Sequence, residues 1–449
     1  MGRLFGTDGI RGEANHAPMD GVTAFLVGQA VTHLSKNGKA TAKIVLGRDT
    51  RISGTMLEHA LSAGIASMGG DPYLTGILPT PGVAFLCRSM HMDAGIMISA
   101  SHNPYEDNGI KIFTGAGFKL SDREEGAIED LIQGGRLAQM APPAREIGQA
   151  RSVDNAPQRY IAFLKACFPT DLSMKGVPIV IDTANGATYQ SAPALFAELG
   201  ADVETIHDAP DGTNINQNCG SQFTQDLCRR VKQGRAVMGL AFDGDGDRLI
   251  AVDETGKAIT GDQIMLICAK ALKDMGRLKN DRVVSTVMSN LGFVLACKKY
   301  GMKHHASQVG DRYVLQDMQR LGAVIGGEDS GHMIFLDHHT TGDGILAAMQ
   351  LIAAMLRQGK PLSDLAGMMD VYPQVLINVE VKRKPEISTL PGLVEAIQQA
   401  EAELGDDGRV LVRYSGTQNL CRVMVEGPTR DVTETYGQQL ADAVKRAIG

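Results

Sequence analysis

A serine, a histidine and a lysine lie close together in one short stretch of the chain. The apolar run 94–98 is typical of a strand and ends in Ser99-Ala100-Ser101-His102-Asn103-Pro104. Pro104 disfavours helical geometry at the residue before it, so both serines are predicted to lie in a turn. The run 110–113 alternates apolar and polar residues like a half-buried strand and brings Lys111 back towards this turn. A serine hydroxyl needs a base, a metal or a strong electrophile to react, so the remaining sequence decides whether Ser101 is more than a turn residue.

A second candidate site is the acidic segment Asp243-Gly244-Asp245-Gly246-Asp247-Arg248, which follows the strand-like run 237–242. Three carboxylates at alternate positions supply the oxygen ligands that Mg²⁺ or Ca²⁺ prefers. An EF-hand is excluded because Arg248 stands where that loop needs glycine, and because the flanking segments have the pattern of strands. The segment therefore predicts a magnesium loop.

Two further segments could bind an anion. The segment Phe5 to Gly12 carries Arg11 in a stretch that is too irregular for periodic structure, and we expect a loop. Near the C-terminus, Arg413-Tyr414-Ser415-Gly416-Thr417 is followed by Arg422, and together they could cradle a phosphate group. Each segment alone is also compatible with an ordinary turn.

Strand-like and helical segments alternate over most of the chain. Helices are expected at 20–35, at 53–68 with Ser53 as its cap, and at 262–275, with strands such as 42–46 between them. This alternation predicts α/β domains with mostly parallel sheets, whose sites lie at the carboxyl ends of strands. A linker at 134–150 and a boundary at 372–373 suggest four domains, 1–150, 151–254, 255–369 and a smaller α+β domain, 370–449.

Composition limits the class of protein. The 449 residues carry 44 basic and 51 acidic side chains without long single-sign runs, which argues against nucleic-acid and membrane partners. Seven scattered cysteines suggest neither a disulfide framework nor a zinc site and fit a reduced cytosol. No apolar run reaches membrane length, and the N-terminus lacks the pattern of a signal peptide. The pair His338-His339 is expected to be solvated rather than a metal site.

Five segments in the same order make the chain resemble the α-D-phosphohexomutase family along essentially its whole length. They are Phe5-Gly6-Thr7-Asp8-Gly9-Ile10-Arg11-Gly12, Ser99-Ala100-Ser101-His102-Asn103-Pro104, Asp243-Gly244-Asp245-Gly246-Asp247-Arg248, Gly327-Glu328-Asp329-Ser330-Gly331-His332 and Arg413-Tyr414-Ser415-Gly416-Thr417. The second and third are the most specific of the five. The Asp-Gly-Ile-Arg-Gly opening favours the bacterial branch that acts on glucosamine 6-phosphate.

The resemblance implies three similar α/β domains with mixed sheets and a smaller C-terminal α+β domain, heart-shaped around a central cleft. It implies a phosphoserine at Ser101 and a Mg²⁺ ion held by Ser101, Asp243, Asp245 and Asp247. Lys111, Arg11 and His102 would assist proton transfer or stabilise charge. A small-molecule sugar phosphate would be bound by Thr7, Arg248, Asp311, Arg312, Glu328, Ser330, His332, Arg413, Ser415, Gly416, Thr417 and Arg422.

The family reaction runs through a sugar 1,6-bisphosphate, so glucosamine or glucose 1,6-bisphosphate is the expected activator. A cytoplasmic homodimer without nucleic-acid or membrane partners is the expectation at family level. The chain departs from the usual family pattern at Asp329 and at Gln418-Asn419, which predicts retained chemistry with altered substrate binding.

Two alternatives remain open, and a third is disfavoured. Phosphomannomutase or phosphoglucomutase activity is the closest of them, and a non-catalytic sugar-phosphate sensor is a more distant one. A serine hydrolase is disfavoured because no Gly-x-Ser-x-Gly elbow surrounds Ser101.

Overall fold

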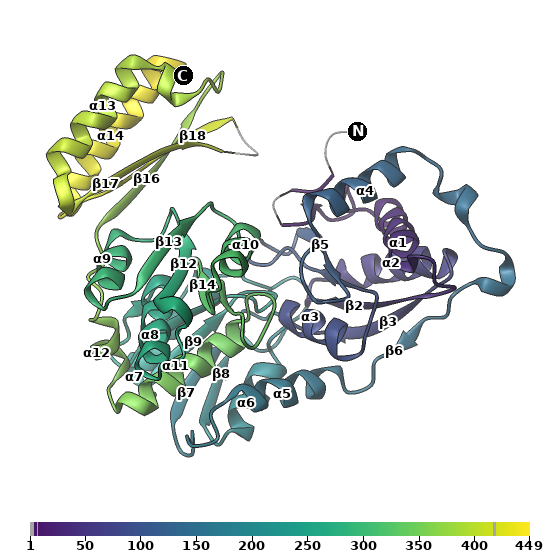
Figure 1. Ribbon diagram of the computed structural model, residues 1–449. Helices are drawn as coiled ribbons and strands as arrows, with labels where there is room; N and C mark the ends of the chain where they lie inside the picture. Colours follow the sequence, from purple (N-terminus) through teal and green to yellow (C-terminus); the bar gives the residue numbers. More distant parts are fainter. Residues whose placement is uncertain (1–3, 7, 416–418) are drawn as a thin grey trace. The chain divides into compact units, whose positions relative to one another are not determined.

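The computed structural model describes residues 4–6, 8–415 and 419–449. The chain divides into two compact units (Figure 1). One consists of Met1–Val287 and Lys303–Gly367, and the other of Met288–Met302 and Met368–Gly449. The first unit contains three sheets flanked by helices, and the second contains one sheet.

The first sheet has the strand order β1 (Ile10–Glu13), β5 (Asp107–Thr114), β4 (Ala94–Ile98), β2 (Ala42–Arg48), β3 (Gly70–Ile77) and β6 (Arg151–Ser152). The pairs β1·β5 and β5·β4 are antiparallel, and the other pairs are parallel, so the sheet is mixed. Residues 10–13 were expected in a loop, and that expectation is wrong because their backbone pairs with β5.

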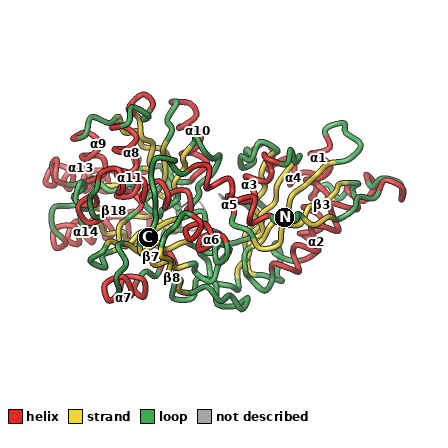
Figure 2. Tube along the Cα trace, turned by 90° about the horizontal axis from the view of Figure 1, so that it is seen from below, coloured by secondary structure: helices red, strands yellow, loops and turns green. Residues whose placement is uncertain are grey.

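Helices lie on both faces of this sheet, as expected for buried strands that are apolar on both sides (Figure 2). Ile44 and Leu46 point towards α1 (Gly21–Lys36) and α2 (Gly54–Ser67), whereas Gly47 lies against Val83 of α3 (Thr80–Ser89). Helix α4 (Asp122–Gln133) packs beside α1.

Ser53 stands at the N-terminus of α2 but does not cap it with its side chain. Its Oγ atom instead accepts a hydrogen bond from Nδ2 of Asn108, 2.8 Å away. Ser53 therefore occupies the expected cap position, but its side chain makes no capping hydrogen bond. The segment 134–150 contains only the short helices η1 (Leu137–Met140) and η2 (Ala144–Glu146).

The second sheet has the order β11 (Ala258–Ile259), β10 (Leu249–Asp253), β9 (Met238–Phe242), β7 (Pro178–Asp182) and β8 (Asp202–Ile206). Its helices are α5 (Ala156–Cys167), α6 (Ser191–Glu198) and α7 (Gln225–Gln233). Strands β9 and β10 form an antiparallel hairpin in which Phe242 pairs with Leu249. The acidic segment 243–248 is the connection of this hairpin, which agrees with the exclusion of an EF-hand.

The third sheet has the order β13 (Lys303–Ser307), β12 (Arg282–Thr286), β14 (Ile325–Gly327) and β15 (Met333–Phe335). The pairs β12·β13 and β12·β14 are parallel, and β14·β15 is antiparallel. Helices α8 (Gly261–Asp274), α10 (Asp311–Leu321), α11 (Gly344–Gln358) and α12 (Leu362–Ala366) complete the first unit.

The second unit has the antiparallel order β16 (Gln374–Glu380), β18 (Leu420–Glu426) and β17 (Arg409–Tyr414). Helices α13 (Pro391–Leu404) and α14 (Arg430–Ile448) lie side by side against one face of this sheet (Figure 1) and share its apolar core. Helix α9 (Leu291–Lys299) also belongs to this unit. In the described part of the chain, no helix is both long and apolar enough to cross a membrane.

Candidate active site

Ser101 lies in the turn that follows β4, as the sequence predicts, and its side chain is buried. Its Oγ atom donates a hydrogen bond to Oδ2 of Asp243 over 2.6 Å. Ser99 is also buried, but its hydroxyl has a supporting role. Its Oγ donates to Oδ2 of Asp49 at 2.5 Å and accepts the backbone N–H of Ser101 at 2.9 Å. Of the two serines, Ser101 is therefore the one in contact with the acidic loop.

The three aspartates of the hairpin connection form one buried cluster. Asp243, Asp245 and Asp247 each offer a carboxylate oxygen, and these oxygens lie within 4.8 Å of one another. Oδ1 of Asp245 and Oδ1 of Asp247 have no hydrogen-bond partner among the described residues. Hard oxygen donors that are buried and clustered, two of them without a hydrogen-bond partner in the described residues, fit a cation such as Mg²⁺.

The electrostatics of the cluster also favour a bound cation. Burial raises the pKa of Asp243 well above its usual value, and the neighbouring charges of Asp245 and Asp247 raise it further. Burial opposes ionisation of Asp247 as well, but Lys111 and His332 hold the pKa of that carboxyl well below its usual value. The neighbouring carboxylates thus oppose ionisation of Asp243, and a bound cation would relieve that opposition.

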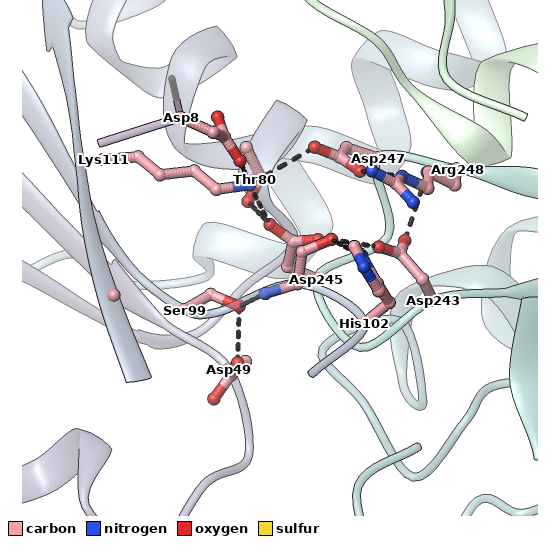
Figure 3. A network of polar contacts seen from close by, with 12 residues as sticks. Asp8, Asp49, Thr80, Ser99, His102, Lys111, Asp243, Asp245, Asp247 and Arg248 are labelled. Carbon is pink, nitrogen blue, oxygen red and sulfur yellow. Dashed lines mark hydrogen bonds and ion pairs between the residues drawn. The ribbon is translucent and has the colours of Figure 1, made fainter. Parts of the chain in front are cut away.

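Lys111 is brought to the cluster by β5 and is 1% exposed. Its Nζ atom lies 2.7 Å from Oδ2 of Asp245 and 3.4 Å from Oδ2 of both Asp247 and Asp8. Burial alone would lower the pKa of this ammonium group, but the surrounding carboxylates raise it well above its usual value. Lys111 is therefore a fixed positive charge beside Asp245 (Figure 3).

Six side chains close a ring in which positive and negative groups alternate, and we call it the charge ring. The successive contacts are Lys111 to Asp8 at 3.4 Å, Asp8 to Lys119, Lys119 to Asp311 at 2.5 Å, Asp311 to His332 at 3.6 Å, His332 to Asp247 at 3.5 Å, and Asp247 back to Lys111 at 3.4 Å. Because Asp247 and Asp311 flank it, the pKa of His332 is raised despite its burial. The ring joins the acidic loop to the N-terminus of α10.

His102 and Arg11 lie at the same site. Nδ1 of His102 is 3.4 Å from Oγ of Ser101. Burial, together with the charges of Arg248 and Arg11, lowers the pKa of His102 to about 4, so its imidazole is neutral at pH 7. Arg11 forms an ion pair with Asp8, and its Nε atom has no hydrogen-bond partner within the described residues.

The predicted sugar loop, residues 326–332, is ordered by several hydrogen bonds. Oε1 of Glu328 accepts the backbone N–H of Gly310 at 3.0 Å, which places this acid beside the N-terminus of α10. The hydroxyl of Ser330 has no hydrogen-bond partner in the described part of the chain. Oδ1 of Asp329 accepts the backbone N–H of Asp262 at 3.2 Å, so this unusual acid supports the start of α8.

Two predicted substrate residues also have protein partners. Arg312 forms ion pairs with Asp122 and Glu125, with the second at 2.5 Å. Arg248 donates its backbone N–H to Oδ1 of Asp243 at 3.1 Å, and its Nε atom has no hydrogen-bond partner in residues 4–6, 8–415 and 419–449.

The predicted phosphate loop belongs to the second unit. Arg413 on β17 pairs in register with Arg422 on β18, and burial together with the charge of Arg422 lowers the pKa of Arg413. Nζ of Lys384 donates to the carbonyl of Ser415 at 2.8 Å, which adds a cation that the sequence did not indicate. Gly416 and Thr417 of this loop, Gln418, and Thr7 of the N-terminal loop lie outside the described residues.

Sequence reasoning missed three residues of the site, namely Asp8 as a ring member, Lys119 and Thr80. Thr80 begins α3, and its Oγ1 donates to Oδ2 of Asp245 at 2.5 Å while its N–H donates to the Asp245 carbonyl. Lys119 and Asp311 are 192 positions apart, so no local spacing could indicate their contact. A polar residue at the N-terminus of a helix was the only available signal for Thr80.

His339 corrects one expectation. The adjacent histidines were expected to be solvated, but His339 is 1% exposed. Its Nε2 lies 2.9 Å from the carbonyl of Pro81, and its Nδ1 accepts the N–H of Thr340 at 2.7 Å. Both ring nitrogens are satisfied by backbone groups, so this histidine is a packing residue, and no metal cluster found in the described residues includes it.

Comparison with known proteins agrees with this geometry. Four models of the phosphoglucomutase/phosphomannomutase family match in succession: α/β/α domain I at residues 2–139, α/β/α domain II at 158–256, α/β/α domain III at 260–372, and the C-terminal domain at 376–443. The chain is 66% identical to a protein of Syntrophobacter fumaroxidans over 100% of both chains. The chain belongs to the α-D-phosphohexomutase family, a family of enzymes, and the resemblance seen in the sequence is confirmed.

The named relatives identify one branch of the family. The Syntrophobacter protein is called phosphoglucosamine mutase, as is a protein of Syntrophus aciditrophicus that is 57% identical over 100% of both chains. A phosphoglucosamine mutase of Myxococcus xanthus is 50% identical over 99% of this chain and 97% of that protein.

Solved structures share the fold. A phosphoglucomutase/phosphomannomutase family protein of Burkholderia thailandensis has a TM-score of 0.81 at 22% identity, with 99% of this chain and 97% of that chain covered. An N-acetylphosphoglucosamine mutase of Aspergillus fumigatus, crystallised with GlcNAc-6P and magnesium, has a TM-score of 0.71 at 18% identity, with 99% and 96% covered. The predicted class of three α/β domains and a C-terminal domain is confirmed.

Proposed function

We propose that this enzyme interconverts glucosamine 6-phosphate and glucosamine 1-phosphate and so supplies precursors of UDP-N-acetylglucosamine and the cell wall. The single observation that carries the chemistry is the 2.6 Å contact between Oγ of Ser101 and the carboxylate of Asp243. It joins a buried hydroxyl to a cluster suited to a divalent cation. The choice of sugar rests on the names of the full-length relatives.

In the proposed reaction, Ser101 begins as a phosphoserine. The bond between its Oγ and phosphorus breaks, a bond from phosphorus to the 1-oxygen of the sugar forms, and the 1-hydroxyl proton passes to a base of the site. The resulting glucosamine 1,6-bisphosphate turns over. The bond between its 6-oxygen and phosphorus then breaks as phosphorus rejoins Oγ of Ser101, and the 6-oxygen takes the proton from the base. Glucosamine 1-phosphate is then released. Glucosamine or glucose 1,6-bisphosphate would load the serine at the start.

Asp243, Asp245, Asp247 and the phosphate on Ser101 would hold Mg²⁺. A bound Mg²⁺ neutralises charge on the oxygens of the transferring phosphoryl group. Lys111 contributes a fixed positive charge beside Asp245 from the protein itself. Arg11 and His102 assist through charge or proton transfer.

Substrate binding is assigned to loops from several domains. Glu328 and Ser330 hold sugar hydroxyls, and the unpaired hydroxyl of Ser330 supports this assignment. Arg413 and Arg422, which are opposite each other on the neighbouring strands β17 and β18, hold the phosphate that does not react. The remaining proposed contacts are Thr7, Arg248, Asp311, Arg312, His332, Ser415, Gly416 and Thr417. We place the domain limits at 1–150, 151–254, 255–369 and 370–449, in a cytoplasmic homodimer.

The departures from the family pattern fall on substrate loops. Asp329 uses one carboxylate oxygen to accept a hydrogen bond from the start of α8, away from the Ser101 and aspartate segments in sequence. Retained chemistry with altered substrate affinity is therefore the expected consequence of Asp329 and of Gln418-Asn419. Restoring the usual Gln at 329 and Glu-Pro at 418–419 should change KM more than kcat.

The test of the proposed function is intact-protein mass spectrometry after incubation with glucose 1,6-bisphosphate. The wild-type protein should gain the mass of one phosphate, and Ser101→Ala should gain none. Absence of any gain in the wild type refutes the phosphoserine mechanism. Turnover of glucosamine, mannose and glucose 6-phosphates measured side by side then separates the proposed substrate from phosphomannomutase or phosphoglucomutase activity.

A further inference from the structure

The backbone of Ser101 has a positive φ of 53°. This left-handed conformation is unfavourable for a residue with a side chain, and it persists only where surrounding contacts hold it. It also sets the direction in which Oγ leaves the backbone and meets Asp243. The contacts that hold this conformation therefore control where the hydroxyl lies.

Two buried side chains hold the carbonyl oxygen of Ser101. Nη2 of Arg51 donates to it at 3.0 Å, and Nδ2 of Asn216 donates to it at 2.9 Å. The same two nitrogen atoms also donate to the carbonyl of Asn103, at 2.8 Å and 3.0 Å respectively. Arg51 and Asn216 thus hold the turn through hydrogen bonds to the same two carbonyl groups.

The Arg51 side chain is itself held in place by further buried hydrogen bonds. Its side chain is fully buried, and its Nη1 donates to the carbonyls of Asp107 at 3.0 Å and of Pro104. Its Nε donates to Oδ2 of Asp49 at 2.9 Å, so the buried charge is neutralised. The two Nη atoms therefore hold the turn, while Nε is paired with Asp49.

Asn216 is hydrogen-bonded to the loop 183–187, which also supports the aspartate loop. Its backbone N–H donates to the carbonyl of Ala184 at 2.9 Å, and the N–H of Ala187 donates to Gly244 at 2.8 Å. A Cβ at Gly244 would lie 2.6 Å from the Ser101 carbonyl oxygen and 2.7 Å from Nδ2 of Asn216. The Ser101 carbonyl, Asn216 and Gly244 are therefore packed without space between them.

A buried carboxylate joins the loop around Ala184 to the segment that carries Asn216. Oδ1 of Asp182 accepts the N–H of Ala184 at 2.9 Å, and its Oδ2 accepts the N–H of Gly220 at 2.8 Å. Nδ1 of His207 lies 3.1 Å from the same Oδ2. Because backbone groups use both oxygens of Asp182, the Asp182, His207 and Cys219 cluster serves to support the loop.

We propose that Arg51 and Asn216 are positioning residues for phosphoryl transfer at Ser101. They act on the Ser101 carbonyl, hold the residue in its left-handed conformation and thereby aim Oγ at the aspartate cluster. Asn216 matters in particular because it fixes the turn after β4 relative to the hairpin that carries Asp243. This inference rests on the proposed function and deepens it.

The test compares two asparagines of one loop. Asn216 and Asn218 both have left-handed backbones, with φ of 57° and 51°, but Asn218 is exposed. Glycine accepts such angles, so Asn216→Gly removes the two side-chain hydrogen bonds without adding backbone strain. Asn218→Gly is the matched control. The rate of Ser101 phosphorylation by glucose 1,6-bisphosphate, followed by mass spectrometry, and kcat and KM are measured for each.

Asn216→Gly should lower the phosphorylation rate and kcat by about tenfold or more while KM changes by less than about twofold, because misplacement of a reacting atom slows the transfer itself. Asn218→Gly should match the wild type. Asn216→Asp keeps the side-chain shape but turns an acceptor towards two carbonyl oxygens. Its phosphorylation rate and kcat should therefore fall further than those of Asn216→Gly. Arg51→Lys keeps the charge but not the forked donors, and it should show the same split between kcat and KM.

Rates are taken per native molecule, with the native fraction read from thermal unfolding curves, so reduced stability alone does not count as support. Wild-type rates in both Asn216→Gly and Asn216→Asp would overturn the proposal. Equal losses in Asn216→Gly and Asn218→Gly would overturn it as well, because they would reflect the loop and not the hydrogen bonds. A wild-type protein that takes up no phosphate would instead refute the proposed function.

Discussion

The Nζ atom of Lys111 lies 2.7 Å from Oδ2 of Asp245, and both side chains are buried. This lysine supplies positive charge to a carboxylate cluster that also fits Mg²⁺. Lys111 and a bound Mg²⁺ would therefore both act on Asp245 and Asp247.

Replacing Lys111 by methionine should destabilise the protein strongly when no metal is present. Breaking a buried ion pair by removing one partner costs about 3 kcal/mol or more, because the other charge stays buried. The free energy of unfolding in buffer with EDTA should fall by that amount, and added Mg²⁺ should stabilise Lys111→Met more than the wild type. Chemical denaturation with and without Mg²⁺ measures both effects.

The control for this experiment is Lys39→Met, which removes a pair with Asp93 in which the lysine side chain is 63% exposed. An exposed pair contributes about 0–1 kcal/mol, so this variant should remain close to the wild type in either buffer. An equal stabilisation of Lys111→Met and Lys39→Met by Mg²⁺ would contradict the idea that Lys111 and Mg²⁺ both neutralise the aspartate cluster.

Replacing Asp245 by asparagine should weaken metal binding. The change removes one of three clustered carboxylates and thus a charged oxygen donor, on which affinity for hard cations depends. The Mg²⁺ concentration that gives half-maximal activity should rise about tenfold or more. The protein is first treated with EDTA, which should abolish turnover by the wild type. Activity is then titrated with Mg²⁺ to obtain the half-maximal concentration. The exposed Asp406→Asn should behave as the wild type, and an unchanged Mg²⁺ requirement in Asp245→Asn would contradict the site.

His339 should make the protein sensitive to acid. Burial lowers its pKa from 6.5 to about 4, and its Nδ1 faces the N–H of Thr340, which cannot accept a proton. In the unfolded chain the imidazole takes up a proton below pH 6.5, whereas in the folded chain it stays neutral until about pH 4. The stability contributed by neutral His339 is thus complete above pH 6.5 and is lost as pH falls towards 4, by about 2 kcal/mol at pH 5.

Urea denaturation at pH 7.5 and pH 5 tests this expectation. His339→Asn should lose less stability between the two pH values than the wild type, by about 2 kcal/mol. His91→Asn changes an exposed histidine and should keep the wild-type difference. Equal losses in the wild type and in His339→Asn would show that other groups cause the acid sensitivity.

Arg422 should be needed for binding the sugar phosphate but not for the chemistry. It stands directly opposite Arg413 on neighbouring antiparallel strands, where two like charges repel unless an anion lies between them. Arg422→Leu should raise KM about tenfold or more with little change in kcat, since a hydrogen bond to a charged group contributes about 1.5–3 kcal/mol. It should also remove the rise in thermal midpoint that inorganic phosphate gives the wild type.

Arg430→Leu is the matched control for Arg422→Leu. Arg430 has a side chain that is 83% exposed and forms a pair within one helix turn. Its replacement should leave KM and the phosphate effect unchanged. A normal KM in Arg422→Leu would place the phosphate site elsewhere.

The sequence by itself determined the parts of the site that are encoded locally. Ser101 was expected in a turn after a strand, and the three aspartates were expected between two strands, and both lie there. Such patterns depend on side-chain periodicity and on turn residues within about ten positions, which a single sequence displays directly. Glycines and a proline at the turns made these predictions specific.

Tertiary structure alone decided how the segments support one another. The contact of Lys119 with Asp311 spans 192 positions, and that of Asn216 with the Ser101 carbonyl spans 115. Nε2 of the buried His339 likewise meets a carbonyl 258 positions away. Neither charge nor periodicity at one position reveals a partner so distant, because the partner is chosen by how sheets and helices pack.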